Sequence, residues 1–309
     1  MEEGMKRYRL FAWSLIFLLF VSCDSKESKN AFQDTTEEGT IYISVDESFK
    51  PVIEEQLRVH QSSFPKANIV VSYKSEADCF RDLQKDSTRM IIVARGLNEK
   101  EAEFYKSALS YQPQYAELAY DAVALIVNNN ASDSIFTFND VKDILSGKHK
   151  ITAVMDGKSA TSTVRYLKDS VLKGGSFGAN VVAANNSQEV IDIVTSRKDV
   201  IGFVGLSWIG DVYDNQQQSY LKKIRLARVE CTACLEKGIF AKPSQSTITY
   251  GQYPLARPLI YVLKENHAGL GTGFMNFMSL ERGQLIFRRS FLAPAKMAFH
   301  KRNSSINNE

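Results

Sequence analysis

The stretch ITAVMDGKSATSTVRYLKD, residues 151–169, carries most of the information about fold and site, because a predicted strand passes into a predicted helix through a hydroxyl-rich turn. The run ITAVM has the β-branched apolar character of a buried strand. Apolar residues then recur at helical spacing at Val164, Leu167, Val171 and Leu172. Ser162 or Thr163 therefore falls near the N-cap of a helix.

This turn fits two interpretations. Free backbone N–H groups and the positive end of the helix dipole lie at a helix start, so hydroxyl groups there suit a phosphate-like or carboxylate ligand. Ser and Thr are also ordinary N-cap residues, so capping alone is the alternative. Arg165 follows in the first helical turn, where it lies beside the ligand or points to solvent. The number of hydroxyl groups favours an anion site.

Strands and helices alternate before this turn, which predicts a parallel sheet covered by helices. The predicted strands are TIYISV from Thr40, the segment Ala67 to Tyr73 and the segment Met90 to Ala94, with helical patterns between them. Ligands of such sheets bind at the carboxyl ends of strands. Three turns qualify as binding positions, and they carry Ser48, Ser75 and Arg95.

A second alternating region begins with AVALIVN after Tyr120, and the segment YPLARPLIYVL from Tyr253 returns the chain to a strand. We therefore predict an α/β fold of two lobes, each a mostly parallel sheet flanked by helices, joined by two hinge strands with the ligand between them. Residues 40–120 and 250–300 form the first lobe and residues 121–249 the second. Residues 301–309 are predicted to be a disordered tail.

The N-terminus predicts export. Lys6, Arg7 and Arg9 precede the apolar run Leu10 to Val21, which is too short for an ordinary transmembrane helix but suits a signal-peptide core. Ser22 and Cys23 follow and resemble a bacterial lipobox, which predicts removal of residues 1–22 and lipidation of Cys23. A signal cleaved without lipidation and an uncleaved anchor are the alternatives. The polar residues 23–39 are predicted to be a flexible tether.

Charge and motifs exclude several classes of function. Removing residues 1–22 takes away three basic and two acidic side chains, so the formal net charge falls from +3 to +2. No Lys/Arg block marks a nucleic-acid binder. The four histidines are scattered, and neither a GxSxG elbow nor a Walker loop is present, so we predict no enzymatic activity and no cofactor.

The cysteines offer a second constellation of reactive side chains. Cys231 and Cys234 form a single CxxC, without the second CxxC or the nearby histidines of a typical zinc motif. In an exported protein this favours a local disulfide, or two free thiols, over metal or redox chemistry. Cys79 is predicted to be a small buried hydrophobic residue.

In this order and spacing, several segments resemble the phosphate-binding, PstS-like substrate-binding proteins of ABC importers, and the resemblance extends from about Gly39 to Ala295. The segments are DESF from Asp46, the turn at Ser75, IIVARGL, AYDAVALIVN, ATSTVRYL, NNSQEVIDIV, IGFVGLSWI, YPLARPL and GF..F....GQ.I...FLAPA. The resemblance implies a type II periplasmic-binding-protein fold that closes on a tetrahedral oxyanion.

The resemblance also implies a ligand set. The family binds its ligand with a Ser-Phe or Thr-Phe pair, a serine after the second strand and a hydroxyl turn in the second lobe. In this chain the matching positions are Ser48 and Phe49, then Ser75, then Thr161, Ser162 and Thr163.

Two positions depart from that family. Arg95 stands at or beside the place of an aspartate that accepts a proton from the ligand, and Asp156 and Lys158 stand where the family has an arginine. Arg95 would donate to an oxyanion by a bidentate contact, or it forms a surface ion pair with Glu99 or Glu101.

The implied function is a lipid-anchored, monomeric binding protein in the cell envelope. It faces the periplasm, captures inorganic phosphate and delivers it to an ABC permease of the inner membrane. The alternatives are another oxyanion such as sulfate, molybdate or tungstate, or a non-transport envelope lipoprotein that uses the fold for sensing or for contact with a partner.

Overall fold

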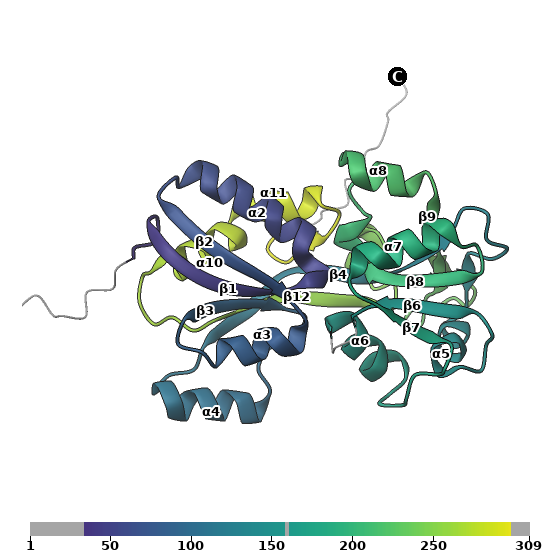
Figure 1. Ribbon diagram of the computed structural model, residues 1–309, viewed down its shortest axis with the longest axis horizontal. Helices are drawn as coiled ribbons and strands as arrows, with labels where there is room; N and C mark the ends of the chain where they lie inside the picture. The colour runs from purple at the N-terminus through teal and green to yellow at the C-terminus, as the bar shows by residue number, and fades with distance from the viewer. Residues whose placement is uncertain (1–33, 158–160, 298–309) are drawn as a thin grey trace, which may run out of the picture. The chain divides into compact units, whose positions relative to one another are not determined.

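The computed structural model describes residues 34–157 and 161–297, and Figure 1 traces their path. The predicted signal peptide, Cys23, Lys158 and the predicted tail lie outside these residues. The first elements are β1 (Gly39–Asp46), the 3₁₀ turn η1 (Glu47–Phe49), α2 (Lys50–Ser63), β2 (Ala67–Lys74), α3 (Glu76–Leu83), β3 (Thr88–Val93), α4 (Glu99–Leu109), β4 (Gln114–Asn128), β5 (Ile135–Phe136) and α5 (Phe138–Ser146).

The later elements begin with the strand that precedes the hydroxyl turn. They are β6 (Thr152–Asp156), α6 (Ser162–Tyr166), the π-helical turn η2 (Leu167–Val171), β7 (Val181–Ala184), α7 (Ser187–Ser196), β8 (Val200–Gly205), η3 (Leu206–Trp208), α8 (Asn215–Leu221), β9 (Ile224–Leu226), β10 (Arg228–Glu230), β11 (Phe240–Ala241), α9 (Gln245–Thr249), β12 (Ala256–Leu263), α10 (Leu270–Ser279), α11 (Glu281–Arg289) and β13 (Ala293–Pro294).

One sheet runs through both halves in the order β2-β1-β3-β12-β4-β8-β6-β7. Strands β1, β2 and β3 pair in parallel, as do β6, β7 and β8, whereas β12 and β4 run antiparallel to their neighbours. The long strand β4 pairs first with β12 and then, from Val123 onward, with β8 and β9. The predicted α/β class is confirmed.

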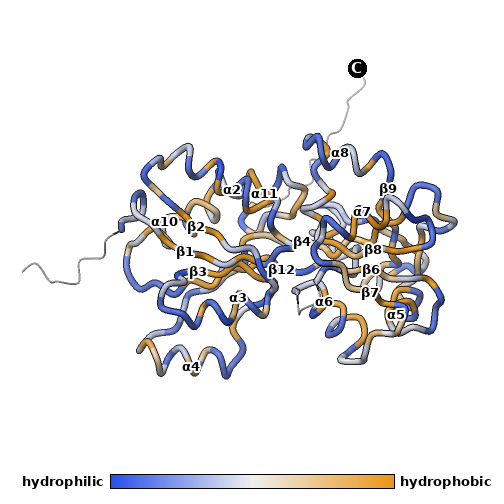
Figure 2. Tube along the Cα trace, viewed as in Figure 1, coloured by the Kyte–Doolittle hydropathy of each residue, from blue (hydrophilic) through white to orange (hydrophobic). Residues whose placement is uncertain are grey.

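Helices cover both faces of the first half of the sheet. Apolar residues of α2, α10 and α11 pack on one face, and those of α3 and α4 pack on the other (Figure 1). Met90 to Val93 of β3 are consequently all buried, which explains why that strand reads as a continuous apolar run. Figure 2 shows the same contrast, with apolar strands beneath helices that are polar on their outer sides.

The second half has a core of its own. It is built from β4, β6 and β8 together with the apolar faces of α5, α6 and α7. The division at residues 120 and 250 stays a prediction, although the separate cores support it. None of the helices in the described ranges combines the length and the apolar character that crossing a bilayer requires.

The start of the described chain is fixed to the first half. Asp34 is buried and accepts hydrogen bonds from Arg89 Nη2 at 2.9 Å and from the backbone N–H of Leu270 at 2.7 Å. The predicted tether therefore extends too far, because the residues from Asp34 onward belong to the folded body. Asp34 holds this segment on the folded body because its carboxylate accepts from the first N–H group of α10. The polar composition of the segment does not reveal this contact.

Candidate functional site

The hydroxyl turn lies where elements of both halves meet. Strand β1 ends at Asp46 and leads through η1 to Ser48, while β6 ends at Asp156 and leads to α6. Both turns follow the carboxyl ends of strands in parallel pairs, which is where ligands of such sheets bind. The side chains at this junction are polar and almost entirely buried. We call them the hydroxyl cluster, and its members are Asp46, Ser48, Asp156, Thr161, Ser162, Thr163, Ser187 and Arg257.

Four hydroxyl groups surround the carboxylate of Asp156. Oδ2 lies 3.1 Å from Ser48 Oγ, 3.2 Å from Thr163 Oγ1 and 3.1 Å from Ser187 Oγ. Thr161 Oγ1 donates to Oδ1 at 3.0 Å. Ser48 comes from the first half and the other three from the second, so the cluster joins the halves. Its donors converge on a negatively charged oxygen, which is the arrangement that binds an oxyanion.

Arg257 is the cationic member of the cluster and comes from β12. Its Nη1 donates to Ser162 Oγ at 3.0 Å and to Thr163 Oγ1 at 3.2 Å, while Nε donates to Asp121 Oδ2 at 3.0 Å. Its guanidinium also lies 5.0 Å from the ring centre of Phe49. Nη2 is 2.9 Å from Asp121 Oδ2 but is not aligned to donate to any described residue. A buried guanidinium N–H beside the hydroxyl cluster thus has no described acceptor.

Two adjacent carboxyl groups of the first half reach helix starts of the second. Asp46 Oδ2 accepts from the backbone N–H of Ser162 at 3.0 Å, and Glu47 Oε2 accepts from Ser187 Oγ at 2.7 Å. Burial raises the pKa of Asp46 to about 6, which Arg257 opposes, and burial raises the pKa of Glu47 to about 7. Burial also raises the pKa of Asp156. These carboxyl groups therefore hold protons closer to neutral pH than exposed ones do.

Comparison with known proteins assigns the chain to a family. The sequence profile of the PBP superfamily domain matches residues 30–281. The chain belongs to the PBP superfamily. The phosphate-binding protein PstS of Pseudomonas aeruginosa is 22% identical over 263 residues, which cover 76% of this chain and 77% of that protein. The PstS of Staphylococcus epidermidis strain RP62A is 27% identical over 202 residues, 59% of this chain and 57% of that protein.

Solved structures show the fold that this superfamily member shares. A putative phosphate ABC transporter substrate-binding protein from Clostridium perfringens, solved with bound phosphate, superposes with a TM-score of 0.67 at 21% identity and covers 84% of this chain and 100% of its own. An ABC-type phosphate transport receptor from Vibrio cholerae gives 0.61 at 16% identity, covering 83% and 100%. The predicted fold is confirmed, and the predicted family is confirmed at the level of the PBP superfamily.

The structure brings together five of the seven ligand positions that the resemblance implied. Ser48, Phe49, Thr161, Ser162 and Thr163 all lie in or against the hydroxyl cluster. Thr161 is also the N-cap of α6, because its hydroxyl accepts from the backbone N–H of Val164. The structure thus shows capping, one of the two interpretations of this turn, and anion binding by the same turn stays a prediction.

Ser75 and Arg95 are not members of the hydroxyl cluster, although Ser75 lines the cleft beside it. Ser75 caps α3 and donates to Asp78 Oδ2 at 2.7 Å. Arg95 donates to both carboxylate oxygens of Glu101, at 2.7 and 2.8 Å, and covers the ring of Phe80. The structure therefore shows Arg95 in the ion pair that was its alternative.

Arg165 also pairs with a carboxylate rather than pointing freely to solvent. It bonds to Glu76 of α3, with Nη2 donating at 3.1 Å. This ion pair joins α6 of the second half to α3 of the first.

Sequence reasoning missed Arg257 and Ser187 as members of the cluster. Arg257 stands in the apolar run YPLARPL, and a lone charged residue inside a buried strand is the signal that could have singled it out. Ser187 opens the helix that follows β7, so it occupies another strand-to-helix turn. Asp156 was noticed only as a departure from the family, and the structure makes it the centre of the hydroxyl groups.

A cleft of about 480 Å³ opens beside the cluster. Residues of both halves line it, and three of them, Glu47, Ser75 and Thr161, also belong to the turns described above. The remaining lining residues are Lys50, Tyr73, Lys74, Gly157, Asn185, Asn186, Gln188 and Trp208.

The cysteines are structural. Cys231 and Cys234 form a disulfide, one of the two states that the sequence left open. Cys79 is fully buried, as predicted, and burial raises the pKa of its thiol. It packs in α3 against the sheet and has no role in the hydroxyl cluster.

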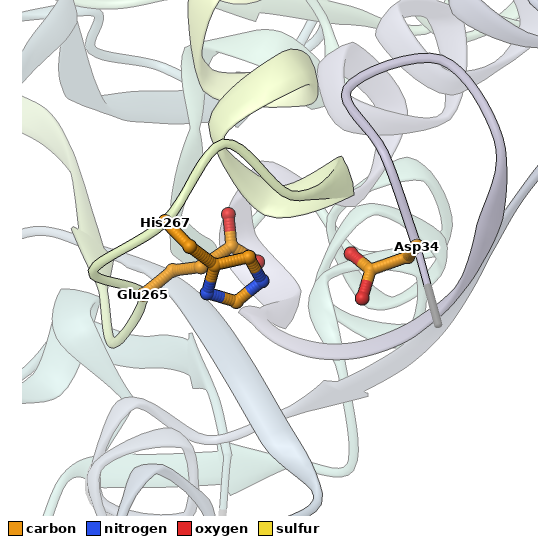
Figure 3. Close-up of side chains that lie close together, drawn as sticks. All are labelled: Asp34, Glu265 and His267. Carbon is orange, nitrogen blue, oxygen red and sulfur yellow. The ribbon is translucent and has the colours of Figure 1, made fainter. Parts of the chain in front are cut away.

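A second group of polar residues resembles a metal site, but an arginine side chain bonds to its carboxylates. Asp34, Glu265 and His267 offer ligand atoms that all lie within 4.8 Å of one another (Figure 3). Arg89 Nη1 donates to Glu265 Oε1 at 2.6 Å and its Nη2 to Asp34. Glu265 also accepts from Thr272 at the start of α10. The guanidinium supplies the positive charge that these carboxylates require, so the group anchors α10.

Proposed function

We propose that the chain is a substrate-binding protein that captures inorganic phosphate in the hydroxyl cluster and delivers it to an ABC permease. The observation that carries the proposal is the convergence of hydroxyl groups from both halves on one anionic position beside the buried guanidinium of Arg257. Similarity to phosphate-binding proteins PstS supports the choice of ligand. The phosphate would take hydrogen bonds that Asp156 now receives.

Capture follows from the division of the donors between the halves. Ser48 Oγ lies 3.2 Å from Thr163 Oγ1, so a ligand at this point contacts both. Such a ligand binds the closed arrangement more tightly than an open one, in which half of its contacts are lost. Phosphate binding would therefore shift the protein toward closure, which is the state that a permease could distinguish.

The buried carboxyl groups favour phosphate over sulfate. Asp46 and Asp156 offer acceptors that a protonated phosphate satisfies through its O–H group. Sulfate, molybdate and tungstate carry no proton at neutral pH, so each would leave an oxygen facing a carboxylate oxygen. The aspartate that the family places after the third strand is thus replaced here by carboxyl groups from β1 and β6.

Export and anchoring complete the proposal. Lipidation of Cys23 would hold the protein in the cell envelope facing the periplasm, and residues 24–33 would separate the lipid from the body. The binding unit would act as a monomer.

The proposal is tested by titrating full-length protein in detergent with phosphate, sulfate and molybdate in a calorimeter. Phosphate should bind more tightly than the other two. The variant Ser162→Ala/Thr163→Val removes two hydroxyl donors and should weaken phosphate binding by about 100-fold or more, since a hydrogen bond to a charged group contributes about 1.5–3 kcal/mol. Thr195→Val, a half-buried threonine at the C-terminal end of α7 and outside the cluster, is the matched control. No phosphate binding by the unaltered protein would refute the proposal and favour the envelope-interaction alternative.

A further inference from the structure

One hydroxyl group lies between two carboxyl groups at the edge of the hydroxyl cluster. Ser187 Oγ is 2.7 Å from Glu47 Oε2 and 3.1 Å from Asp156 Oδ2, so both contacts are within hydrogen-bond distance. A serine hydroxyl carries a single hydrogen and can donate it to only one of two carboxylates at a time. The second contact is therefore a hydrogen bond only when one of the two carboxyl groups carries a proton.

Glu47 is the carboxyl group that is placed to carry this proton. It is half-buried and lines the cleft, whereas Asp46 and Asp156 are fully buried. Both oxygens of Asp46 accept from backbone N–H groups of the cluster, so Asp46 needs no proton to complete its hydrogen bonds. Burial and the nearby carboxylate of Asp156 raise the pKa of Glu47 to about 7, although the hydrogen bonds from Ser187 act in the opposite direction. Solvent in the cleft can thus protonate Glu47 near neutral pH.

The charges around Glu47 do not offset its negative charge. The charged groups at the ends of the neighbouring elements are Asp46 of β1, Asp156 of β6, Lys50 of α2, Lys74 of β2, Glu189 of α7 and Arg257 of β12. The three cations pair with acidic partners of their own, which are Glu54, Asp82 and Asp121. Strand β8 and the turn η3 also pack against η1 and carry no charged residue. An ionised Glu47 therefore adds a charge of the same sign as the anion to be bound.

Protonation of Glu47 changes the anion site in two ways. A protonated Glu47 donates its O–H to Ser187 Oγ, so the hydrogen of Ser187 points toward the position of the Asp156 carboxylate, where the anion is proposed to bind. An ionised Glu47 takes that hydrogen for itself. The proton also removes a negative charge close to the anion, and repulsion between like charges is strong in a poorly solvated interior. Both effects favour anion binding when Glu47 is protonated.

We propose that Glu47, acting through Ser187, takes up a proton from solvent when the anion binds and thereby makes anion capture dependent on pH. Glu47 is a positioning residue, because its proton sets the direction of the Ser187 hydroxyl group and does not itself contact the ligand. This inference rests on the proposed function, because it concerns the same anion site. The affinity for the anion should be highest at acidic pH and should fall as the pH rises through the pKa of Glu47 in the free protein.

The experiment measures the dissociation constant of inorganic phosphate by calorimetry at pH 6 and pH 8, on full-length protein in detergent and on its Glu47→Gln variant. Glutamine keeps a donor toward Ser187 but cannot ionise. Phosphate changes its own ionisation in this range, so the two proteins are compared at each pH. The dissociation constant of the unaltered protein, divided by that of Glu47→Gln, should rise by about tenfold from pH 6 to pH 8, as linkage to one proton with a pKa of about 7 requires.

Two further variants make the test specific. Glu54→Gln neutralises an exposed carboxylate of α2 and is the matched control, which should keep the pH dependence of the unaltered protein. Ser187→Ala keeps Glu47 but removes the hydroxyl group between the two carboxyl groups, so it should reduce the pH dependence. Infrared difference spectra give a readout that does not depend on affinity. Addition of phosphate at pH 8 should produce the band of a protonated carboxyl group, and Glu47→Gln should lack this band.

The outcomes separate this inference from the proposed function. Equal pH dependence in the unaltered protein and in Glu47→Gln would overturn the inference and leave phosphate capture intact. Full pH dependence in Ser187→Ala would overturn the action of Glu47 through Ser187. Failure of the unaltered protein to bind phosphate at either pH would overturn the proposed function together with this inference.

Discussion

Replacing Arg257 by methionine should separate the stability of the hydroxyl cluster from its function. Arg257 and Asp121 form an ion pair in which both side chains are fully buried. Methionine keeps much of the apolar volume but leaves the carboxylate of Asp121 buried and unpaired. Breaking a buried pair in this way costs about 3–5 kcal/mol, a large part of the roughly 5–15 kcal/mol that stabilises a typical domain.

A second substitution makes the prediction specific. Asp121→Asn removes the unpaired charge and keeps the oxygen that accepts from the backbone N–H of Leu206. The double variant Arg257→Met/Asp121→Asn should therefore recover most of the lost stability, to within about 2 kcal/mol of the unaltered protein. It should not recover phosphate binding, because the guanidinium that contacts Ser162 and Thr163 is still absent.

The assays are urea unfolding of residues 24–309 and calorimetric titration with phosphate. Arg81→Met is the matched control, since Arg81 is largely exposed and pairs only with Asp78 of its own helix turn, so its loss should cost no more than about 1 kcal/mol. If the free energy of unfolding of the single Arg257→Met variant lay within about 1 kcal/mol of that of the unaltered protein, the buried pair would not contribute strongly to stability. Full phosphate affinity in the double variant would remove Arg257 from the site.

Two further predictions concern charged groups around the cluster. Since the folded-state pKa of Glu47 is raised from 4.5 to about 7, the folded state binds more protons than the unfolded state between these values, and stability should fall as pH rises from 5 to 8. Glu47→Gln should reduce that fall by roughly 2 kcal/mol in urea unfolding at the two pH values, and an unchanged difference would contradict the assignment. Because Arg95 pairs with Glu101 outside the cluster, Arg95→Asp should leave the ratio of phosphate to sulfate affinity unchanged in a competition titration. A clear change in that ratio would return Arg95 to the site.

Short-range patterns in the sequence predicted those parts of the site that are formed by residues close together in the chain. The turn from Thr161 to Thr163 follows a β-branched strand and precedes helical spacing, so its place at a strand end and helix start follows from short-range physics. Ser48 follows from the same reasoning at the first strand. The alternation of strands and helices likewise gave the fold class, because parallel strands require crossover helices.

Position after a strand was not enough to place a residue in the hydroxyl cluster. Ser75 and Arg95 both follow strands, as predicted, yet each bonds to an acidic residue within the next few positions. Short-range partners of this kind compete with a distant site, and capping by Ser75 and the pairing of Arg95 with Glu101 are both local. Because Glu101 is close to Arg95 in the sequence, the ion pair could be stated in advance as an alternative to a ligand contact. Which of the two forms depends on tertiary geometry.

Arg257 could not be found by local reasoning because its partners are remote. It meets Ser162 across 95 positions of the chain and Asp121 across 136. Only the pairing of β12 with β4, in which Arg257 lies opposite Asp121, brings them together. The register of these two antiparallel strands thus determines where the guanidinium of Arg257 lies in the site.

The charge of the cluster constrains any ligand that enters it. Asp46 and Asp156 of the cluster and Asp121 beside it are fully buried, and Arg257 is the only cation that the described residues place among them. A fully deprotonated anion would add negative charge to a buried group in which carboxylates already outnumber guanidinium. Repulsion of that kind is strong in a poorly solvated interior, so either the ligand or a carboxyl group has to carry a proton. The pKa values of Asp46 and Asp156 are already raised without an added ion, because burial disfavours their charged forms. Anion capture at this site should therefore be coupled to proton uptake, which calorimetry in buffers of different ionisation enthalpy would measure as a buffer-dependent heat.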